Sequence, residues 1–145
     1  MINTPIVPIK ESEKKILASS NNNFQIELIL NIGTNDYSDL IEISKYLAKK
    51  FGNQALLTEH NILKYFNKNT LPFVARYNNI IIGYIIGVPI ENFESESWAQ
   101  YDYNIGKKNT LYTYSFVIRE QFQSRGGYAK TLKRIYINWA KKKKY

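Results

Sequence analysis

Two adjacent glycines in the C-terminal third have the clearest potential for chemistry. Gly126 and Gly127 end the polar stretch Gln123-Ser124-Arg125-Gly126-Gly127. Glycine carries no Cβ, so backbone N–H groups can approach an anion closely at such a position. A helix that begins there adds unpaired N–H groups and the positive end of its dipole. The turn is therefore a candidate phosphate site, and a plain turn before a tight helix start is the alternative.

An acidic and aromatic stretch supplies the other side chains that could act chemically. Residues 89–110 form a connection of about 20 residues, a length typical of functional loops and of loops that contain a short helix. No basic residue precedes Lys107, and the stretch carries four carboxylates and four aromatic rings: Glu91, Phe93, Glu94, Glu96, Trp98, Tyr101, Asp102 and Tyr103. Its charge suits a cationic ligand, and Glu96 and Asp102 are candidate general bases by location. The alternative is a solvated loop whose rings pack onto the sheet.

The glycine turn needs a strand before it and a helix after it in order to hold a phosphate. In residues 111–118 larger and smaller side chains alternate, which predicts a half-buried strand. After the turn, apolar residues recur at spacings of three and four, which predicts an amphipathic helix with one stripe formed by Ala129, Leu132, Ile135, Tyr136 and Trp139.

The upstream part predicts one more strand and two helices. Residues 24–30 are rich in Ile and Leu, as in a strand. Leu40, Ile43 and Leu47 share one face of a helix that closes at Gly52, and Thr58 caps a second, shorter helix. The first 23 residues hold two prolines and end in a Ser/Asn run. We interpret residues 1–23 as a leader or short helix followed by a linker, and residues 24–145 as the domain.

A hairpin is expected between the helices and the acidic stretch. Strands at 73–77 and 80–88 flank Asn78 and Asn79, and asparagine tolerates the left-handed conformation that a two-residue hairpin turn requires. Gly83 and Gly87 interrupt the second strand, which predicts a bulge or a close approach of another segment to its backbone.

Composition limits the class of protein. At 145 residues the chain has the size of one domain, and its 44% hydrophobic content is typical of a folded globule. It contains no cysteine, which excludes disulfides, thiolate metal sites and a cysteine nucleophile. The sequence has neither the apolar run of a signal peptide nor the roughly 18 apolar residues of a membrane span. We therefore expect a cytoplasmic protein without a membrane partner.

The net charge of +8 is distributed unevenly along the chain. Residues 1–106 contain nine Lys/Arg and eleven Asp/Glu, whereas residues 107–145 contain eleven Lys/Arg and one Glu. The basic part includes the glycine turn, where a cationic field would attract an acidic cofactor. A nucleic-acid surface on the last helix is a weaker alternative, because only Tyr136, Trp139 and Tyr145 lie near its basic residues and Trp139 falls on the apolar stripe.

The glycine turn in this setting resembles the motif of the GCN5-related N-acetyltransferases, the GNAT superfamily. In that family Gln/Arg-x-x-Gly-x-Gly/Ala joins a strand to a helix. Gln123-Ser124-Arg125-Gly126 fits its first half and Gly127-Tyr128-Ala129 fits its second, with a loop one residue longer than usual. Gly83-Tyr84-Ile85 is similar to the hairpin strand that comes before this strand in the family.

The resemblance implies an α/β (α+β) fold in which helices flank a mixed, mostly antiparallel central sheet, as in the acyl-CoA N-acyltransferases. Family members continue with a further strand, a helix and a final strand pair, whereas this sequence stops at Tyr145. We therefore expect a partial domain without the C-terminal strand–helix–strand portion. Its strand at 111–118 would expose an edge, which predicts self-association and weak activity.

The resemblance also implies acetyl-coenzyme A as cosubstrate and no metal. Backbone groups of the strand at 111–118 would align the pantetheine arm, and the glycine turn would hold the pyrophosphate. The implied cofactor-binding residues are Thr113, Ser115, Phe116, Val117, Ile118, Gln123, Ser124, Arg125, Gly126, Gly127, Tyr128 and Ala129.

The implied reaction is acetyl transfer to a primary amine of a small molecule or peptide, and the acidic stretch favours a cationic acceptor. Without a cysteine, we expect direct attack in a ternary complex and no covalent enzyme intermediate. A carboxylate or an ordered water must then accept the proton of the amine. The alternatives are a truncated, non-catalytic module that binds coenzyme A or a protein partner, and the basic nucleic-acid binder.

Overall fold

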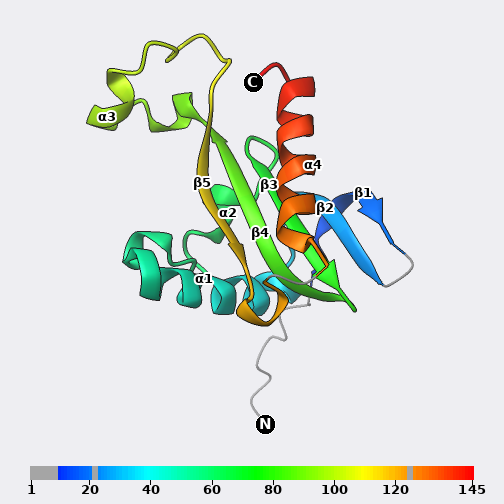
Figure 1. Ribbon diagram of the computed structural model, residues 1–145. Helices are drawn as coiled ribbons and strands as arrows, with labels where there is room; N and C mark the ends of the chain where they lie inside the picture. The colour runs from blue at the N-terminus through cyan, green and yellow to red at the C-terminus, as the bar shows by residue number, and fades with distance from the viewer. Residues whose placement is uncertain (1–9, 21–22, 124–125) are drawn as a thin grey trace.

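A five-stranded antiparallel sheet forms the centre of the protein (Figure 1). The computed structural model describes residues 10–20, 23–123 and 126–145. Each strand pairs with its neighbours in sequence, so the sheet order is the chain order: β1 (Glu13–Ser19), β2 (Phe24–Asn31), β3 (Leu71–Tyr77), β4 (Ile80–Pro89) and β5 (Leu111–Ile118). This arrangement makes β1 and β5 the edge strands of the described sheet.

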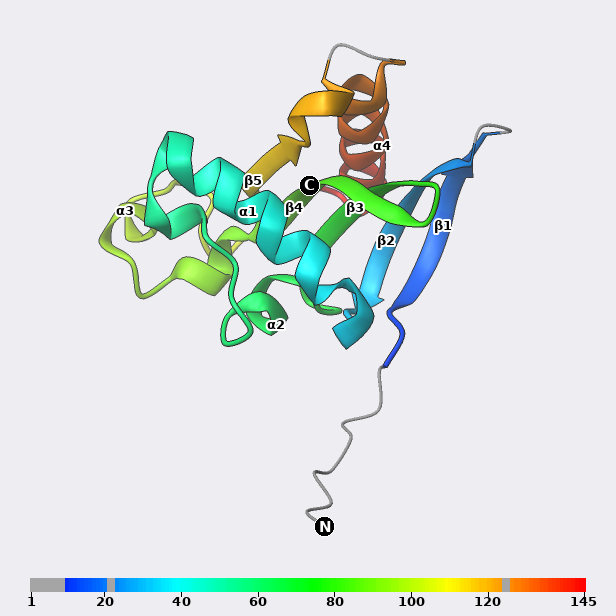
Figure 2. The same cartoon turned by 90° about the horizontal axis from the view of Figure 1, so that it is seen from below.

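Helices cover both faces of the sheet (Figure 2). On one face lie α1 (Tyr37–Phe51) and the single turn α2 (Ile62–Tyr65), and on the other lies α4 (Tyr128–Lys142). The β4–β5 connection contains α3 (Ser97–Gln100), and the described residues also form four short 3-10 helices: η1 (Thr34–Asp36), η2 (Asn53–Ala55), η3 (Ile90–Phe93) and η4 (Glu120–Phe122). None of the helices in the described ranges has the length and apolar character that a membrane crossing requires.

The two long helices bury the stripes that their sequences predict. Leu40, Ile43 and Leu47 of α1 are buried in the core on its side of the sheet, and α1 ends at Gly52, whose φ is 99°. Leu132 and Tyr136 of α4 are buried in the second core, with Ala129, Ile135 and Trp139 packed against it. Both helices are therefore held by one apolar face each, as the spacing of three and four predicts.

The predicted two-residue hairpin turn is present between β3 and β4. Asn78 and Asn79 have φ values of 50° and 69°, so both central residues are left-handed. Two such residues give the turn a twist that matches the twist of the flanking strands. The second helix is shorter than expected and extends only over Ile62–Tyr65. Its N-cap is Asn61, where the sequence predicted Thr58.

The N-terminal segment corrects the sequence interpretation. Residues 13–19, expected in a leader or short helix, form β1 and pair antiparallel with β2. Polar contacts continue this attachment beyond the strand, since the Ser12 hydroxyl donates to Asp36 at 2.7 Å and accepts from the Gly33 N–H at 2.7 Å. The sequence pattern hardly indicates this strand, because β1 has only a short apolar pair and lies exposed at the edge of the sheet.

A buried ionic cluster joins the first three strands to the start of α1. The Arg76 guanidinium donates to both carboxylate oxygens of Glu27 and both of Asp36 at 3.0–3.1 Å. Glu27 is fully buried and also receives Lys14 of β1 at 3.1 Å. Burial alone would raise the pKa of Asp36, but the hydrogen bonds from Arg76 and Ser12 outweigh it and hold that pKa below 3.8. Asp36 is thus ionised, and both carboxylates are paired with Arg76 inside the fold.

Removing the central cation should destabilise the protein strongly. In Arg76→Met two buried carboxylates lose their shared partner, and we expect the free energy of unfolding to fall by about 3–5 kcal/mol. Arg134→Met is the matched control, because Arg134 is exposed on α4 and its loss should change stability by no more than about 0.5 kcal/mol. Urea unfolding of the three proteins measures both effects. Equal unfolding free energies for the two variants would contradict a structural role for the cluster.

The open edge of β5 should make the 145-residue chain self-associate. An edge strand presents unpaired N–H and C=O groups that can pair with another chain. We expect light scattering to show a mean mass that rises with protein concentration. A monodisperse monomer across that concentration range would show that the edge is protected.

Candidate active site

The glycine turn lies between β5 and α4, as predicted. β5 ends at Ile118, η4 follows, and Gly126 and Gly127 adopt left-handed φ values of 57° and 67° directly before α4. Gly127 is the N-cap and has no side chain that could cover the first N–H groups of the helix. A Cβ at Gly127 would meet no atom of the described residues within 4 Å, so none of these residues fills the space in front of the helix start. This is the geometry in which a helix N-terminus can receive an anion.

The other predicted turn residues have distinct places. The Gln123 side chain donates to the Ile118 carbonyl at 2.8 Å and thereby braces the turn. The Tyr128 ring faces the core and contacts Phe24 at a centroid distance of 4.5 Å, so it supports the helix start from behind. Ser124 and Arg125 lie outside the described residues.

A groove leads from the helix start along β5. Its first part has a volume of about 270 Å³ and is lined by the predicted residues Phe116, Val117, Ile118, Gln123 and Ala129, together with the C-terminal end of α1. Its second part, about 350 Å³, reaches Tyr112, Tyr114 and Ser115 and the η2 turn. Leu47, Phe51 and Phe116 line both parts, so they adjoin, and we call them together the β5 groove.

The backbone of β5 is accessible beside this groove. β5 pairs with β4 on one side only, and the register shifts so that Ile86 faces Ser115 while Gly87 faces Thr113. Tyr114 is therefore an extra residue in β5, a bulge of the kind that bends a strand and interrupts its ladder. The Thr113 side chain turns away to the α4 side, where its hydroxyl lies 3.0 Å from the Tyr136 hydroxyl. Any contact of Thr113 with a ligand in the groove would then come from its backbone.

Three hydroxyl groups gather at the middle of β5. Tyr84 Oη and Ser115 Oγ are buried next to each other, and neither has any other hydrogen-bond partner within the described part of the chain. Burial raises the pKa of Tyr84 well above its ordinary value, and the neighbouring Tyr114 raises it further. Burial likewise raises the pKa of Tyr114, whose hydroxyl donates to the Gln54 carbonyl. Both phenols are therefore neutral at pH 7; the Tyr114 O–H is taken by the Gln54 carbonyl, which leaves the Tyr84 O–H as the donor.

Lys50 is a site residue that the sequence analysis missed. It lies in the last turn of α1 and lines the first part of the groove with Gln123 and Ala129. Its interaction with the Tyr46 side chain raises the pKa of Lys50, so the ammonium group stays charged. The sequence showed only a basic helix end, which is ordinarily explained by the helix dipole.

The two candidate bases lie away from the groove lining. Glu96 is exposed and precedes α3, and Asp102 accepts the Asn104 N–H at 2.8 Å in the following turn. Neither lines either part of the β5 groove, and the described lining residues include no carboxylate. Their role as bases stays a prediction.

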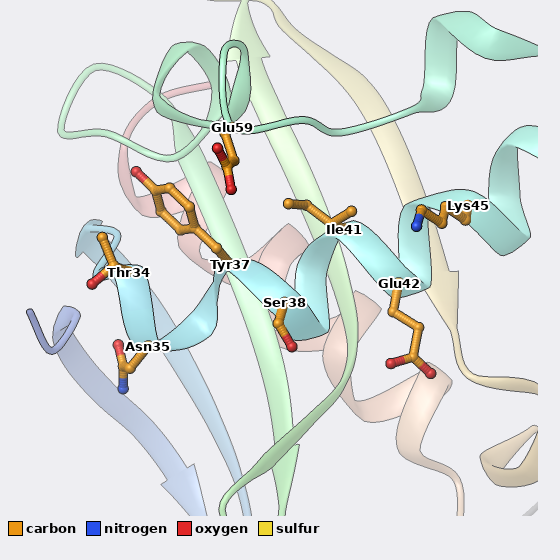
Figure 3. A pocket seen from close by; sticks show the side chains of 8 residues that line it. All are labelled: Thr34, Asn35, Tyr37, Ser38, Ile41, Glu42, Lys45 and Glu59. Carbon is orange, nitrogen blue, oxygen red and sulfur yellow. The ribbon is translucent and has the colours of Figure 1, made fainter. Parts of the chain in front are cut away.

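A larger hollow of about 1020 Å³ lies elsewhere, on the outer side of α1 (Figure 3). It extends from Thr34 along α1 to Lys45. Glu59, which belongs to the loop before α2, lies beside Tyr37 of α1. No residue of β5 or α4 lines it, so it is separate from the β5 groove. Within the described ranges, no cluster of three or more His, Cys, Asp or Glu side chains is arranged to hold a metal ion.

A family model and solved structures of known proteins match this chain. The family model described as "Acetyltransferase (GNAT) family" matches residues 38–145. A solved aminoglycoside acetyltransferase from an uncultured soil metagenomic sample, in complex with trehalose, has a TM-score of 0.58 and 21% identity over 86% of this chain and 74% of that one. Its complex with sisomicin gives a TM-score of 0.57 with the same identity and coverage. The structural likeness confirms the predicted fold class, and a search of curated proteins gives no match.

Closing the space before α4 should weaken binding of coenzyme A. Gly127→Glu adds a carboxylate where N–H groups would meet a phosphate, and we expect the dissociation constant to rise about tenfold or more, given up to ~2 kcal/mol for a charge at a helix end. Calorimetric titration of coenzyme A into the folded variant measures this change.

Two control variants separate charge from backbone strain. Gly127→Asn introduces a residue that tolerates the left-handed conformation and adds no charge, so this variant should bind coenzyme A more tightly than Gly127→Glu. Gly106→Glu places the same carboxylate at another glycine with positive φ and an open Cβ direction, and should leave affinity near that of the unaltered chain. Unchanged affinity in a folded Gly127→Glu protein would remove the turn from the binding site.

Proposed function

The chain belongs to the GNAT family of acetyltransferases, and on this basis we propose that it transfers the acetyl group of acetyl-coenzyme A to a primary amine by direct attack in a ternary complex. The observation that supports this most is the continuity of the β5 groove, which joins an uncapped helix start to a group of buried hydroxyls. A molecule that is anionic at one end and reactive at the other fits such a groove.

The phosphate end of the cosubstrate would lie at the start of α4. The open direction above Gly127 and the unpaired N–H groups of the first helical turn suit a pyrophosphate. Lys50, on the facing wall, adds a positive charge to this end of the groove. Since residues 107–145 carry eleven Lys/Arg and one Glu, the surrounding field also favours an anion.

The pantetheine arm would lie along β5. Its amide groups match the open backbone groups of an edge strand, as an added strand would. Leu47, Phe51 and Phe116 provide apolar walls on the way to the bulge at Tyr114. In this placement the residues from Thr113 to Ile118 act through their backbone more than through their side chains.

Acetyl-coenzyme A supplies an acetyl group activated as a thioester. The amine nitrogen attacks the carbonyl carbon, the carbon–sulfur bond breaks, and the nitrogen loses a proton while the thiolate gains one. Ser115, which lines the groove, can donate a hydrogen bond to oxygen or sulfur as negative charge develops, and the fully buried Tyr84 hydroxyl lies next to it and can orient it. With no carboxylate among the described lining residues, we propose that water accepts the amine proton.

The acceptor is proposed to be cationic before it reacts. Four carboxylates and no Lys or Arg occur between Pro89 and Gly106, in the connection that leads into β5. The solved neighbour complexed with sisomicin is an aminoglycoside acetyltransferase, which supports a small amine as acceptor. Steering by the carboxylates should weaken as salt shortens the range of the field.

Acceptor preference can be measured directly. We expect a polyamine to be acetylated with a kcat/KM at least about tenfold above that of a neutral aryl amine, corresponding to roughly 1.4 kcal/mol, with a lysine peptide between them. Raising the salt concentration from 0.05 to about 0.5 M should reduce the difference, because exposed charges are screened beyond a Debye length. A clear preference for the neutral amine would contradict the cationic acceptor.

Calorimetry separates the proposed enzyme from its alternatives. Binding of acetyl-coenzyme A with turnover is the expected result. Binding without turnover for any amine would favour a non-catalytic module that holds coenzyme A. Absence of binding to both coenzyme A and acetyl-coenzyme A would contradict the proposed function.

A further inference from the structure

Three aromatic rings form a packed platform where the β4–β5 connection meets β5. Phe93, Trp98 and Tyr112 lie at centroid distances of 5.3, 5.3 and 5.1 Å from one another, so each ring contacts the other two. Phe93 is half-buried against the core, whereas Trp98 is 49% exposed and Tyr112 is 41% exposed. In the aromatic platform, Phe93 packs against the core, and Trp98 and Tyr112 expose part of their rings to solvent.

The platform is continuous with the β5 groove. Tyr112 belongs to both, since it also lines the second part of the groove beside Tyr114 and Ser115. Tyr112 lies near the start of β5 and the glycine turn follows its end, so the platform is at the opposite end from the proposed phosphate site (Figure 1). A ligand on the platform would therefore lie next to the acceptor side of the groove.

Two carboxylates adjoin the platform residues in the chain. Glu94 and Glu96 are exposed and lie between Phe93 and Trp98 in the chain. Another ring of the same connection contacts a cation, because the Lys107 ammonium lies 3.4 Å from the centroid of the Tyr103 ring. An ammonium group over an indole or phenol face is stabilised by the quadrupole of the ring, and nearby carboxylates add Coulomb attraction.

We propose that the aromatic platform binds a second, non-reacting ammonium group of the acceptor. The acceptor class is then a polyamine, with one amine at the middle of β5 and another over Trp98 and Tyr112 beside Glu94 and Glu96. This inference rests on the proposed acetyl transfer for the identity of the reacting amine. It adds that recognition comes from a site separate from the reacting centre, so a monoamine lacks half of the contacts.

Fluorescence tests the platform without requiring turnover. The chain has two tryptophans, so Trp139→Phe leaves Trp98 as the single reporter. We expect spermidine to change the Trp98 emission with saturation, and butylamine to bind at least about fivefold more weakly, in line with one cation–π contact. Calorimetry with the unaltered chain repeats the comparison if Trp139→Phe does not fold.

Charge variants identify the partner groups. Glu94→Gln and Glu96→Gln should each weaken spermidine binding by about threefold or more while leaving butylamine unchanged. Glu59→Gln is the matched control, because it removes the same charge from an exposed residue of the loop before α2. Equal spermidine affinity in all three variants would overturn the proposal, as would an equal loss for butylamine.

Turnover measurements test the aromatic platform and the proposed acetyl transfer separately. In Trp98→Ala we expect the KM for spermidine to rise and its kcat to change little, because the platform lies apart from the reacting centre. Spermidine binding at Trp98 without acetyl transfer would refute the proposed function and leave the platform intact. Acetyl transfer with identical kinetics in Trp98→Ala would refute the platform and leave the proposed function intact.

Discussion

The seating of α4 on β4 through a glycine is the contact on which the site depends. A Cβ at Gly87 would lie 2.6 Å from the Tyr136 hydroxyl, so only glycine lets the helix approach this closely. Tyr136 also meets Thr113 across the neighbouring strand and packs edge-on against Phe73. These contacts fix the height of α4 over the sheet, and with it the position of Gly127 relative to the open edge of β5.

The opposite wall of the groove is coupled to β5 by a tyrosine. Tyr114 stacks on Tyr65 with ring centroids 4.1 Å apart, and its hydroxyl donates to the Gln54 carbonyl. The bulge that places Tyr114 in β5 therefore also sets the distance to η2 and the end of α1. β5 therefore positions both walls of the groove. The buried Arg76 cluster stabilises β1, β2 and β3 toward the other edge of the sheet, and none of its residues lines the groove.

Local patterns in the sequence determined most of the fold. The alternation in residues 111–118, the apolar stripe from Ala129 to Trp139 and the pair Asn78-Asn79 each describe interactions between residues close in sequence, and the structure confirms all three. β1 was missed because its stabilisation comes from distant partners, such as the Lys14 contact with Glu27. β1 also exposes most of its side chains, and its sequence lacks the alternation that identified the other edge strand, β5.

The same difference divides the site. Gly126 and Gly127 were recognisable because a left-handed turn before a helix is a local property of the backbone. Lys50, Tyr84 and the ring contacts of Trp98 were not, since each gains its role from a segment far away in the chain. A glycine turn between a strand and a helix is therefore predictable from the residues alone. Which side chains face that turn depends on the tertiary structure, because packing of the sheet against α1 and α4 brings them together.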